Sequence, residues 1–342
     1  MRKEIHFYCV YILARSVGLD PEKSKLIANC SQYVDDHIYD FPLRFENGAI
    51  FKQIPTAYKP TQVNKIVPQD VSIEPTLLFH FLPSGSDLII ETNSPIIQGI
   101  CNYAIKEKDA YLLGIVLHVL ADSYSHKYFK GVYDPYNKVR IVKGKKHVRS
   151  LLKYFLTFIP PIGHGMVDTV PDIPNIVWAF KRNNQVTPVS NFINTQLALK
   201  SILETLKSFC KLHYPELYSE KLNKSVLIKL YDLIRILPEN SEKCCKMIQN
   251  AIQANYFSFP DYQAGDVRVT YDADKWFSET VRLTEPSGLK NVIKIYLKHK
   301  IFSYYPCKAH QDFYTSHYYR FNKAAQKYKM YVVNSYLHDI LI

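Results

Sequence analysis

The chain has 342 residues, of which 47% are hydrophobic and 22% are charged, a balance that indicates a globular protein and argues against disorder. Its 11 glycines are few, which disfavours glycine-rich phosphate loops and turn-dense β architectures. A formal net charge of +12 favours anionic partners, because the summed field steers phosphate esters, nucleic acid or an acidic membrane surface toward the protein. Much of the excess lies in the run KVRIVKGKKHVR at 138–149, for which a solvated surface patch is the simpler interpretation.

Seven cysteines are scattered without any CxxC spacing, which predicts reduced thiols of an intracellular protein. The opening MRKEIHFYCVYILAR is basic and then apolar, but His6 interrupts the apolar run and no small-residue cleavage site follows. We therefore expect the first helix of the mature fold here. No apolar stretch reaches the roughly 18 residues that span a bilayer. We expect a cytoplasmic protein, or one exported by a route without a cleaved signal peptide.

Helices are predicted wherever apolar residues recur at three-and-four spacing. In chain order these segments are 4–17, 21–38, 97–127, 147–158, 190–214, 220–236, 241–256, 286–301 and 310–338. The stretch 41–90 holds six prolines and is expected to be irregular, with a short strand near 48–53, and a second proline-rich passage covers 160–174. The pattern predicts an all-α protein, a multi-helix bundle with long irregular loops. We expect a helical region 1–182 with a second helical region 183–342 packed on it, as one compact domain; two domains are the alternative.

Within the third helix, the stretch GIVLHVLADSYSH places His118, Asp122 and His126 four residues apart. Four-residue steps drift by only about 40° around a helix, so the three side chains share one narrow stripe. Neutral imidazole and carboxylate together suit zinc and similar divalent ions. The neighbours are apolar, and an unpaired buried aspartate is costly. A metal stripe and a hydrogen-bonded core triad are both consistent with this helix alone.

Other residues with metal-ligand chemistry precede and follow this helix. His164 and Asp168 again stand four residues apart, and His80 lies in the apolar string LLFHFLP. In chain order the further candidates are His6, Asp35, Asp36, His80, His164 and Asp168. The order of these residues favours a metal site.

That order resembles the superfamily of zinc-dependent phospholipases C and single-strand-specific zinc nucleases, all-helical enzymes whose sites hold two or three zinc ions. Their ligands follow the same order, with a central HxxxD helix, a further histidine, and a final His-x3-Glu or His-x3-Asp pair. The string LGIVLHVLADSYSH is also similar to a segment of the heterokaryon-incompatibility C and related bacterial branches. The strings HFYCVYILAR, SQYVDD, FHFLP and GHG, with PD a few residues later, resemble an uncharacterised bacterial family of domain-of-unknown-function proteins. The resemblance extends from residue 6 to about residue 180.

Carried over by position, the resemblance implies that Asp122 is a carboxylate shared between metals. His118 and His80, with either Asp35 or Asp36, would complete one zinc site. The other aspartate of this adjacent pair would take the proton of the attacking water, so both are candidate catalytic residues.

By the same resemblance, His126, His164 and Asp168 would hold a second zinc. Asp168 stands where the phospholipases use glutamate. His6 would contribute to a third site, but in the secreted enzymes the mature N-terminal amine completes that site, and here five residues precede His6. The third site is therefore expected to be absent, altered or completed by Asp36.

The resemblance implies a metal-dependent hydrolase of phosphoric esters, similar to a phospholipase C or a nuclease, with two or three zinc ions or other divalent metals. Phospholipid, nucleic acid or a small phosphodiester would fit as substrate, and peripheral membrane contact is compatible with the charge. The alternative is a non-catalytic protein whose helices are stabilised by metal, and a further one is nucleic-acid binding through 138–149. Asp172 and His37 are near enough in sequence to orient ligating imidazoles, although a cap or surface position is the more ordinary role.

Overall fold

The computed structural model describes residues 1–58, 74–143, 163–220, 222–262, 264–283, 305–309 and 312–337. The helices predicted at 147–158 and 286–301 lie outside the described residues. All seven cysteines are free and buried. Among the described residues, no helix is long and apolar enough to cross a membrane.

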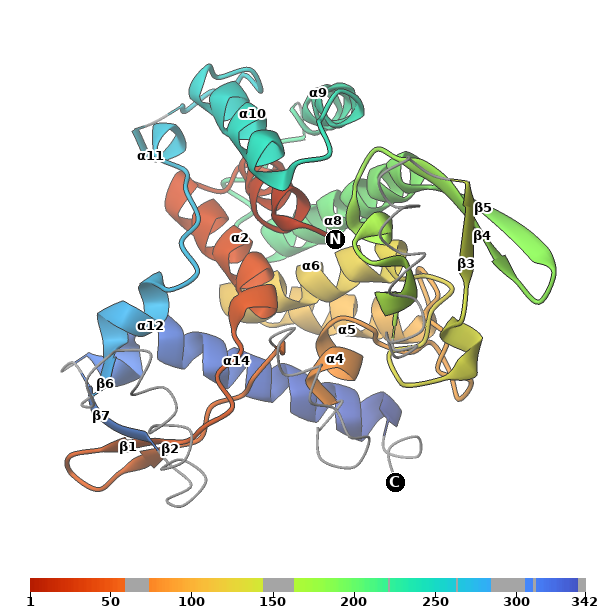
Figure 1. Ribbon diagram of the computed structural model, residues 1–342. Helices are drawn as coiled ribbons and strands as arrows, with labels where there is room; N and C mark the ends of the chain where they lie inside the picture. The colour runs from red at the N-terminus through yellow and green to blue at the C-terminus, as the bar shows by residue number, and fades with distance from the viewer. Residues whose placement is uncertain are drawn as a thin grey trace.

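Helix α6 (Ala110–Ser125) runs through the middle of the molecule (Figure 1). Every residue from Tyr111 to Ser125 is buried, because the helix is apolar on all sides and is covered all round. Its neighbours are η1 (Glu4–Cys9), α2 (Pro21–Asp36), α4 (Glu74–Phe79), α5 (Pro95–Lys106), α8 (Asn191–His213) and α14 (His317–Val332).

The single helix predicted at 97–127 is two helices. The chain leaves helical geometry at Glu107, and the Asp109 side chain then accepts hydrogen bonds from the backbone N–H groups of Tyr111 and Leu112. An aspartate that caps a new helix in this way satisfies otherwise unpaired donors. The stripe of histidines on α6 faces α2 and the chain's beginning, where His118 contacts the carbonyl of Ser31 and Asp122 contacts His6.

The other helical elements are short or belong to the second half of the chain. They are α1 (Val10–Ser16), η2 (Pro135–Asn137), η3 (Gly165–Val167), η4 (Val170–Asp172), α9 (Asn223–Arg235), α10 (Ser241–Gln253), α11 (Ala264–Val267), α12 (Lys275–Thr280), η5 (Phe313–Thr315) and η6 (Val333–Leu337). Helices α9 and α10 lie together at one end of the molecule (Figure 1).

The prediction of an all-α fold is wrong, because the described chain contains two β-sheets and is mixed α and β. One sheet has the order β2-β1-β7-β6, with strands β1 (Leu43–Phe45), β2 (Ile50–Phe51), β6 (Val281–Leu283) and β7 (Tyr305–Ala309). Strand β1 is antiparallel to β2 and parallel to β7. The short strand expected near 48–53 is present as β2.

The second sheet is antiparallel, in the order β3-β4-β5, with strands β3 (Arg140–Lys143), β4 (Val177–Arg182) and β5 (Gln185–Ser190). It stands at one side of the molecule (Figure 1). Its inner face carries Trp178, Phe180 and Val189 into a small apolar core. The same core contains Phe81 and Phe129, which lie next to candidate metal ligands.

Candidate metal centre

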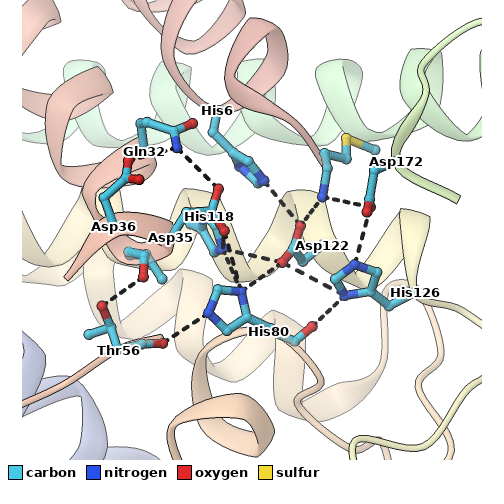
Figure 2. A network of polar contacts seen from close by, with 12 residues as sticks. His6, Gln32, Asp35, Asp36, Thr56, His80, His118, Asp122, His126 and Asp172 are labelled. Atoms are coloured by element: carbon cyan, nitrogen blue, oxygen red, sulfur yellow. Dashed lines mark hydrogen bonds and ion pairs between the residues drawn. The ribbon is translucent and has the colours of Figure 1, made fainter. Parts of the chain in front are cut away.

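Histidine and aspartate side chains converge at the middle of α6, on the side facing α2 (Figure 2). Three groups bring donor atoms within 4.8 Å of one another. They are His6 with His118 and Asp122, Asp35 with His80 and His118, and His126 with His164 and Asp172. His118 belongs to the first two groups, and His126 Nδ1 of the third lies 3.7 Å from Asp122 Oδ2, so the groups form one continuous centre.

Asp122 occupies the middle of this centre and is only 1% exposed. Its Oδ1 lies 3.1 Å from His6 Nε2, and its Oδ2 lies 3.2 Å from His118 Nε2 and 3.3 Å from His80 Nδ1. Burial raises the pKa of a carboxyl, but the Met1 ammonium and the surrounding imidazoles outweigh burial and hold the pKa of Asp122 well below its usual range. Asp122 is therefore a carboxylate in contact with several nitrogen donors.

Four of the imidazoles are held by backbone carbonyl oxygens. One ring nitrogen of each lies at hydrogen-bond distance from such an oxygen: His118 Nδ1 from Ser31 (2.8 Å), His80 Nε2 from Thr56 (2.9 Å), His126 Nδ1 from His80 (2.7 Å) and His164 Nδ1 from Asp168 (2.7 Å). A carbonyl only accepts, so that ring nitrogen carries the proton. In a neutral ring the other nitrogen then presents a lone pair to the centre, which is how proteins orient metal-binding histidines.

Burial favours the neutral form of several of these rings. It lowers the pKa of His6 and of His118 to about 4, and it lowers the pKa of His164. For His80, burial acts in the same direction, but the hydrogen bond to Asp122 and the charge of Asp35 raise its pKa overall. His6 and His118 are consequently neutral at physiological pH, which is the state that binds a metal.

A family model matches nearly the whole of this chain, from residue 1 to residue 336, and it is described as "Family of unknown function (DUF6765)". The chain belongs to this family. No curated protein and no solved structure matches it. The matched span of the DUF6765 chain includes α14 and so goes well beyond residue 180, where the resemblance seen in the sequence ends.

The N-terminal amine of this DUF6765 chain lies inside the centre, although five residues precede His6. The π-helical turn η1 brings the Met1 amine into contact with Asp122 and to 3.2 Å from Asp172 Oδ1. Burial alone would lower the pKa of the amine, but Asp122, Asp172 and Asp35 together raise it to about 11. At neutral pH this amine is an ammonium, a positive charge beside Asp122 and Asp172 that the sequence interpretation did not place there.

Contacts from α10 and the loop before it hold the start of the chain in this position. Arg2 Nε donates to Glu4 (2.7 Å), and Arg2 Nη1 donates to the carbonyl of Glu239 (2.6 Å). Ser241 Oγ donates to Glu4 Oε2 at 2.6 Å, and Glu4 is fully buried. The second half of the chain thus positions the first residues beside the metal ligands.

The adjacent carboxylates at the end of α2 face different surroundings. Asp35 Oδ1 lies 3.7 Å from His80 Nδ1 and 3.8 Å from His118 Nε2. Asp36 instead accepts hydrogen bonds from Tyr271 (2.7 Å) and Gln32 (3.0 Å). Gln32 also donates to Asp35 at 3.2 Å. The structure therefore assigns Asp35 to the centre, and the prediction that Asp36 is a ligand does not agree with the geometry.

Asp168, predicted as a ligand, is replaced by Asp172. The backbone of Asp168 ends η3 with φ 51° and ψ −140°, its side chain is exposed, and its carbonyl oxygen alone contacts His164. Asp172 lies 3.3 Å from both His126 Nε2 and His164 Nε2. The spacing argument assumed a helix after His164, whereas the segment forms two separate 3-10 turns, so the residue four positions on points elsewhere.

His37 is not part of the centre. Its Nε2 donates to Asn322 Oδ1 of α14 at 3.1 Å, and its ring stacks on Tyr33. Its carbonyl accepts the backbone N–H of Thr56 at 2.9 Å. His37 thus supports the segment whose Thr56 carbonyl orients His80.

Proposed function

We propose that the protein is a metal-dependent hydrolase of phosphoric esters, with a centre for two or three divalent ions, preferentially zinc. The observation that carries this proposal is the set of imidazoles anchored on carbonyl oxygens with their second nitrogens directed at buried carboxylates. Lone pairs facing carboxylate oxygens repel one another unless a proton or a cation lies between them. Nitrogen and carboxylate oxygen donors together fit zinc.

His118 presents a single lone pair, on Nε2, so it would hold one ion, either with His6 and Asp122 or with Asp35 and His80. His126, His164 and Asp172 would hold another, and the Met1 amine, after losing its proton, would lie within reach of Asp122 and Asp172. Divalent ions bound there supply Lewis acidity toward a phosphoryl oxygen and make water more acidic. The resemblance to zinc phospholipases C and nucleases supports this chemistry.

In the arrangement in which His118 binds with His6 and Asp122, Asp35 holds no ion and is the proposed general base. Its side chain is 31% exposed, whereas that of Asp122 is 2% exposed, so Asp35 is the carboxylate of this pair that substrate and water can reach. Burial of its carboxyl raises the pKa of Asp35 above the usual range, which makes it a better proton acceptor. Gln32 fixes one of its oxygens and leaves the other toward His80 and His118.

At one of the three groups, the structure supports a bound ion that only stabilises the fold. His6, His118 and Asp122 are all at most 1% exposed, as expected of a closed site that stabilises helices. The other two groups contain partly exposed members, Asp35 and His164. We therefore expect substrate to reach the two more open groups, while the closed group stabilises the helices and its Asp122 also supports the neighbouring His80.

Elemental analysis of protein purified without chelators tests the proposal, together with hydrolysis of bis-p-nitrophenyl phosphate and of a phosphocholine ester. Asp122→Asn is expected to lose metal and to lower hydrolysis by at least about 100-fold, and removal of metal by a chelator should do the same. His213→Ala is the control, because this histidine is not part of the centre and contacts the carbonyl of Ile105 and the ring of Phe209. Protein without any transition metal would contradict the proposal, and bound metal without hydrolysis would favour the structural role.

A further inference from the structure

The outer face of the three-stranded sheet is cationic. Arg140 of β3 lies opposite Lys181 of β4, and Lys181 lies opposite Val186 of β5. The next pair along the strands, Ile141 and Phe180, points inward to the small core. Because successive residues of a strand alternate between faces, Arg140, Lys181 and Val186 all point outward.

Two cations directly opposite each other on one face destabilise a sheet unless something compensates their charge. No carboxylate of the described residues pairs with Arg140 or Lys181. Segments 127–143 and 177–190 together contain seven lysines and arginines and a single carboxylate, Asp134, which already pairs with Lys130 at 2.9 Å. The arrangement is therefore expected to be compensated by an anionic partner outside the described chain.

Aliphatic side chains are interspersed with these cations. Val177 is 58% exposed, Val186 is 54% exposed, and Pro188 beside them is also exposed. The hairpin turns at Asn183 and Asn184, whose φ angles of 47° and 66° suit asparagine, and it projects from the body of the molecule (Figure 1). The most projecting part of the sheet thus offers both positive charge and apolar surface.

We propose that this face docks on an acidic phospholipid surface. Lysine and arginine attract anionic headgroups, while aliphatic side chains gain free energy by leaving water at the boundary of the acyl chains. Single-stranded nucleic acid would use aromatic stacking. Tyr128 and Tyr133 are exposed in the segment before β3, but the outward positions of β4 and β5 carry none of Phe, Tyr or Trp. The mixture of cations and aliphatic residues therefore favours lipid over nucleic acid.

The inner face of the same sheet is tied to the metal centre. Trp178 Nε1 donates to Asn191 Oδ1 at 2.9 Å, and Asn191 Nδ2 donates to the carbonyls of Val170 (2.6 Å) and Ile173 (2.8 Å). These carbonyls flank Asp172. Docking through the outer face would bring the His126, His164 and Asp172 group close to the lipid surface.

Vesicle sedimentation tests this proposal without relying on metal or turnover. The full chain is expected to bind vesicles of phosphatidylcholine with about one third phosphatidylglycerol, but not pure phosphatidylcholine, and added salt should release it. The double variant Arg140→Gln/Lys181→Gln is expected to bind roughly 30-fold more weakly. The matched control is Lys224→Gln/Lys246→Gln, which removes the same charge from exposed positions of α9 and α10 and should bind as the native chain does.

The variant Val186→Ser distinguishes binding to lipid from binding to nucleic acid. Only a lipid surface has an apolar region that the Val186 side chain can enter. The substitution should weaken vesicle binding without changing the binding of a fluorescent single-stranded oligonucleotide. Equal loss of vesicle binding in the two double variants would overturn the proposal, because only net charge would then matter. Tight oligonucleotide binding that depends on Arg140 and Lys181, with no vesicle binding, would overturn it in favour of nucleic acid.

Discussion

Asp122 contacts more groups of the centre than any other side chain described here, and it does so from a buried helix. Two of its neighbours come from α6 itself or its end, and the others come from η1 and the residue after α4. A buried carboxylate in this position stays ionised only because positive charge or proton donors surround it. A metal ion that takes the place of the Met1 ammonium must likewise supply the positive charge that keeps Asp122 ionised.

The placement of Asp172, rather than Asp168, beside His126 and His164 gives a prediction about single residues. Asp172→Asn is expected to lower the metal content of the protein and to weaken its affinity for added zinc by at least about tenfold, because it removes an anionic ligand next to His126 and His164. Asp168→Asn removes the same charge four residues earlier and should leave zinc affinity unchanged. Isothermal titration of zinc into both variants measures the difference. Equal losses, or a loss only in Asp168→Asn, would show that the observed placement of these carboxylates is wrong.

Seven of the nine predicted site residues converge in the structure: His6, Asp35, His80, His118, Asp122, His126 and His164. Those on α6 could be predicted because helix geometry is local. Asp36 and Asp168 could not be judged, since the direction of a side chain at a helix end or in a loop depends on distant partners such as Tyr271. The Met1 amine and the carbonyls that orient the histidines could not be predicted, because they are backbone groups and no pattern of side chains indicates them.

At the scale of elements, α2 and α6 approach closely at Gly114. A Cβ added there would collide with Cys30 Cβ and lie 2.5 Å from the carbonyl oxygen of Ile27, which is backbone and cannot move aside. Gly114→Ala should therefore destabilise the protein by about 1 to 3 kcal/mol, despite the better helix propensity of alanine.

Gly99→Ala on α5 is the matched control for this prediction. The three atoms nearest its new Cβ would all belong to the end of the Tyr336 side chain, whereas those at Gly114 include backbone. We expect this variant to be close to neutral in urea unfolding. Equal stability of the two variants would contradict the close packing of α2 on α6.

The helices were largely predictable and the sheets largely not, for a physical reason. A helix can be predicted from the spacing of apolar residues within one continuous segment, as for α8 and α10. Strand β1 has three residues, and its parallel partner β7 begins 262 positions later, where Leu43 lies opposite Tyr305. A pairing at that separation leaves no local signal.

At the scale of the whole molecule, His37 joins α2 to the last helix and gives a pH prediction. Burial lowers its pKa from 6.5 to about 4, against a smaller opposing effect of the Asn322 hydrogen bond. Between these values the unfolded chain binds a proton that the folded chain does not. The free energy of unfolding should therefore decrease as pH falls from 6.5 to 4, by roughly 3 kcal/mol for this group.

Urea unfolding at pH about 7.5 and about 4.5 measures this loss, and His37→Gln isolates it from the other buried histidines. The variant should lose less stability on acidification than the native chain does. If both proteins lost the same free energy of unfolding on acidification, His37 would not be a source of the pH dependence.

Helix α14 contacts the first half of the chain at two further points. Asn322 accepts the backbone N–H of Ile54 at 2.9 Å, and Tyr328 donates to the carbonyl of Leu78 at 2.9 Å. These residues flank the loop that carries Thr56 and the short helix before His80. A fragment that ends at residue 182 would keep every proposed protein ligand yet lack the support that holds His80 in place. Separation of the two regions by limited proteolysis would therefore release metal, even though no ligand had been cut away.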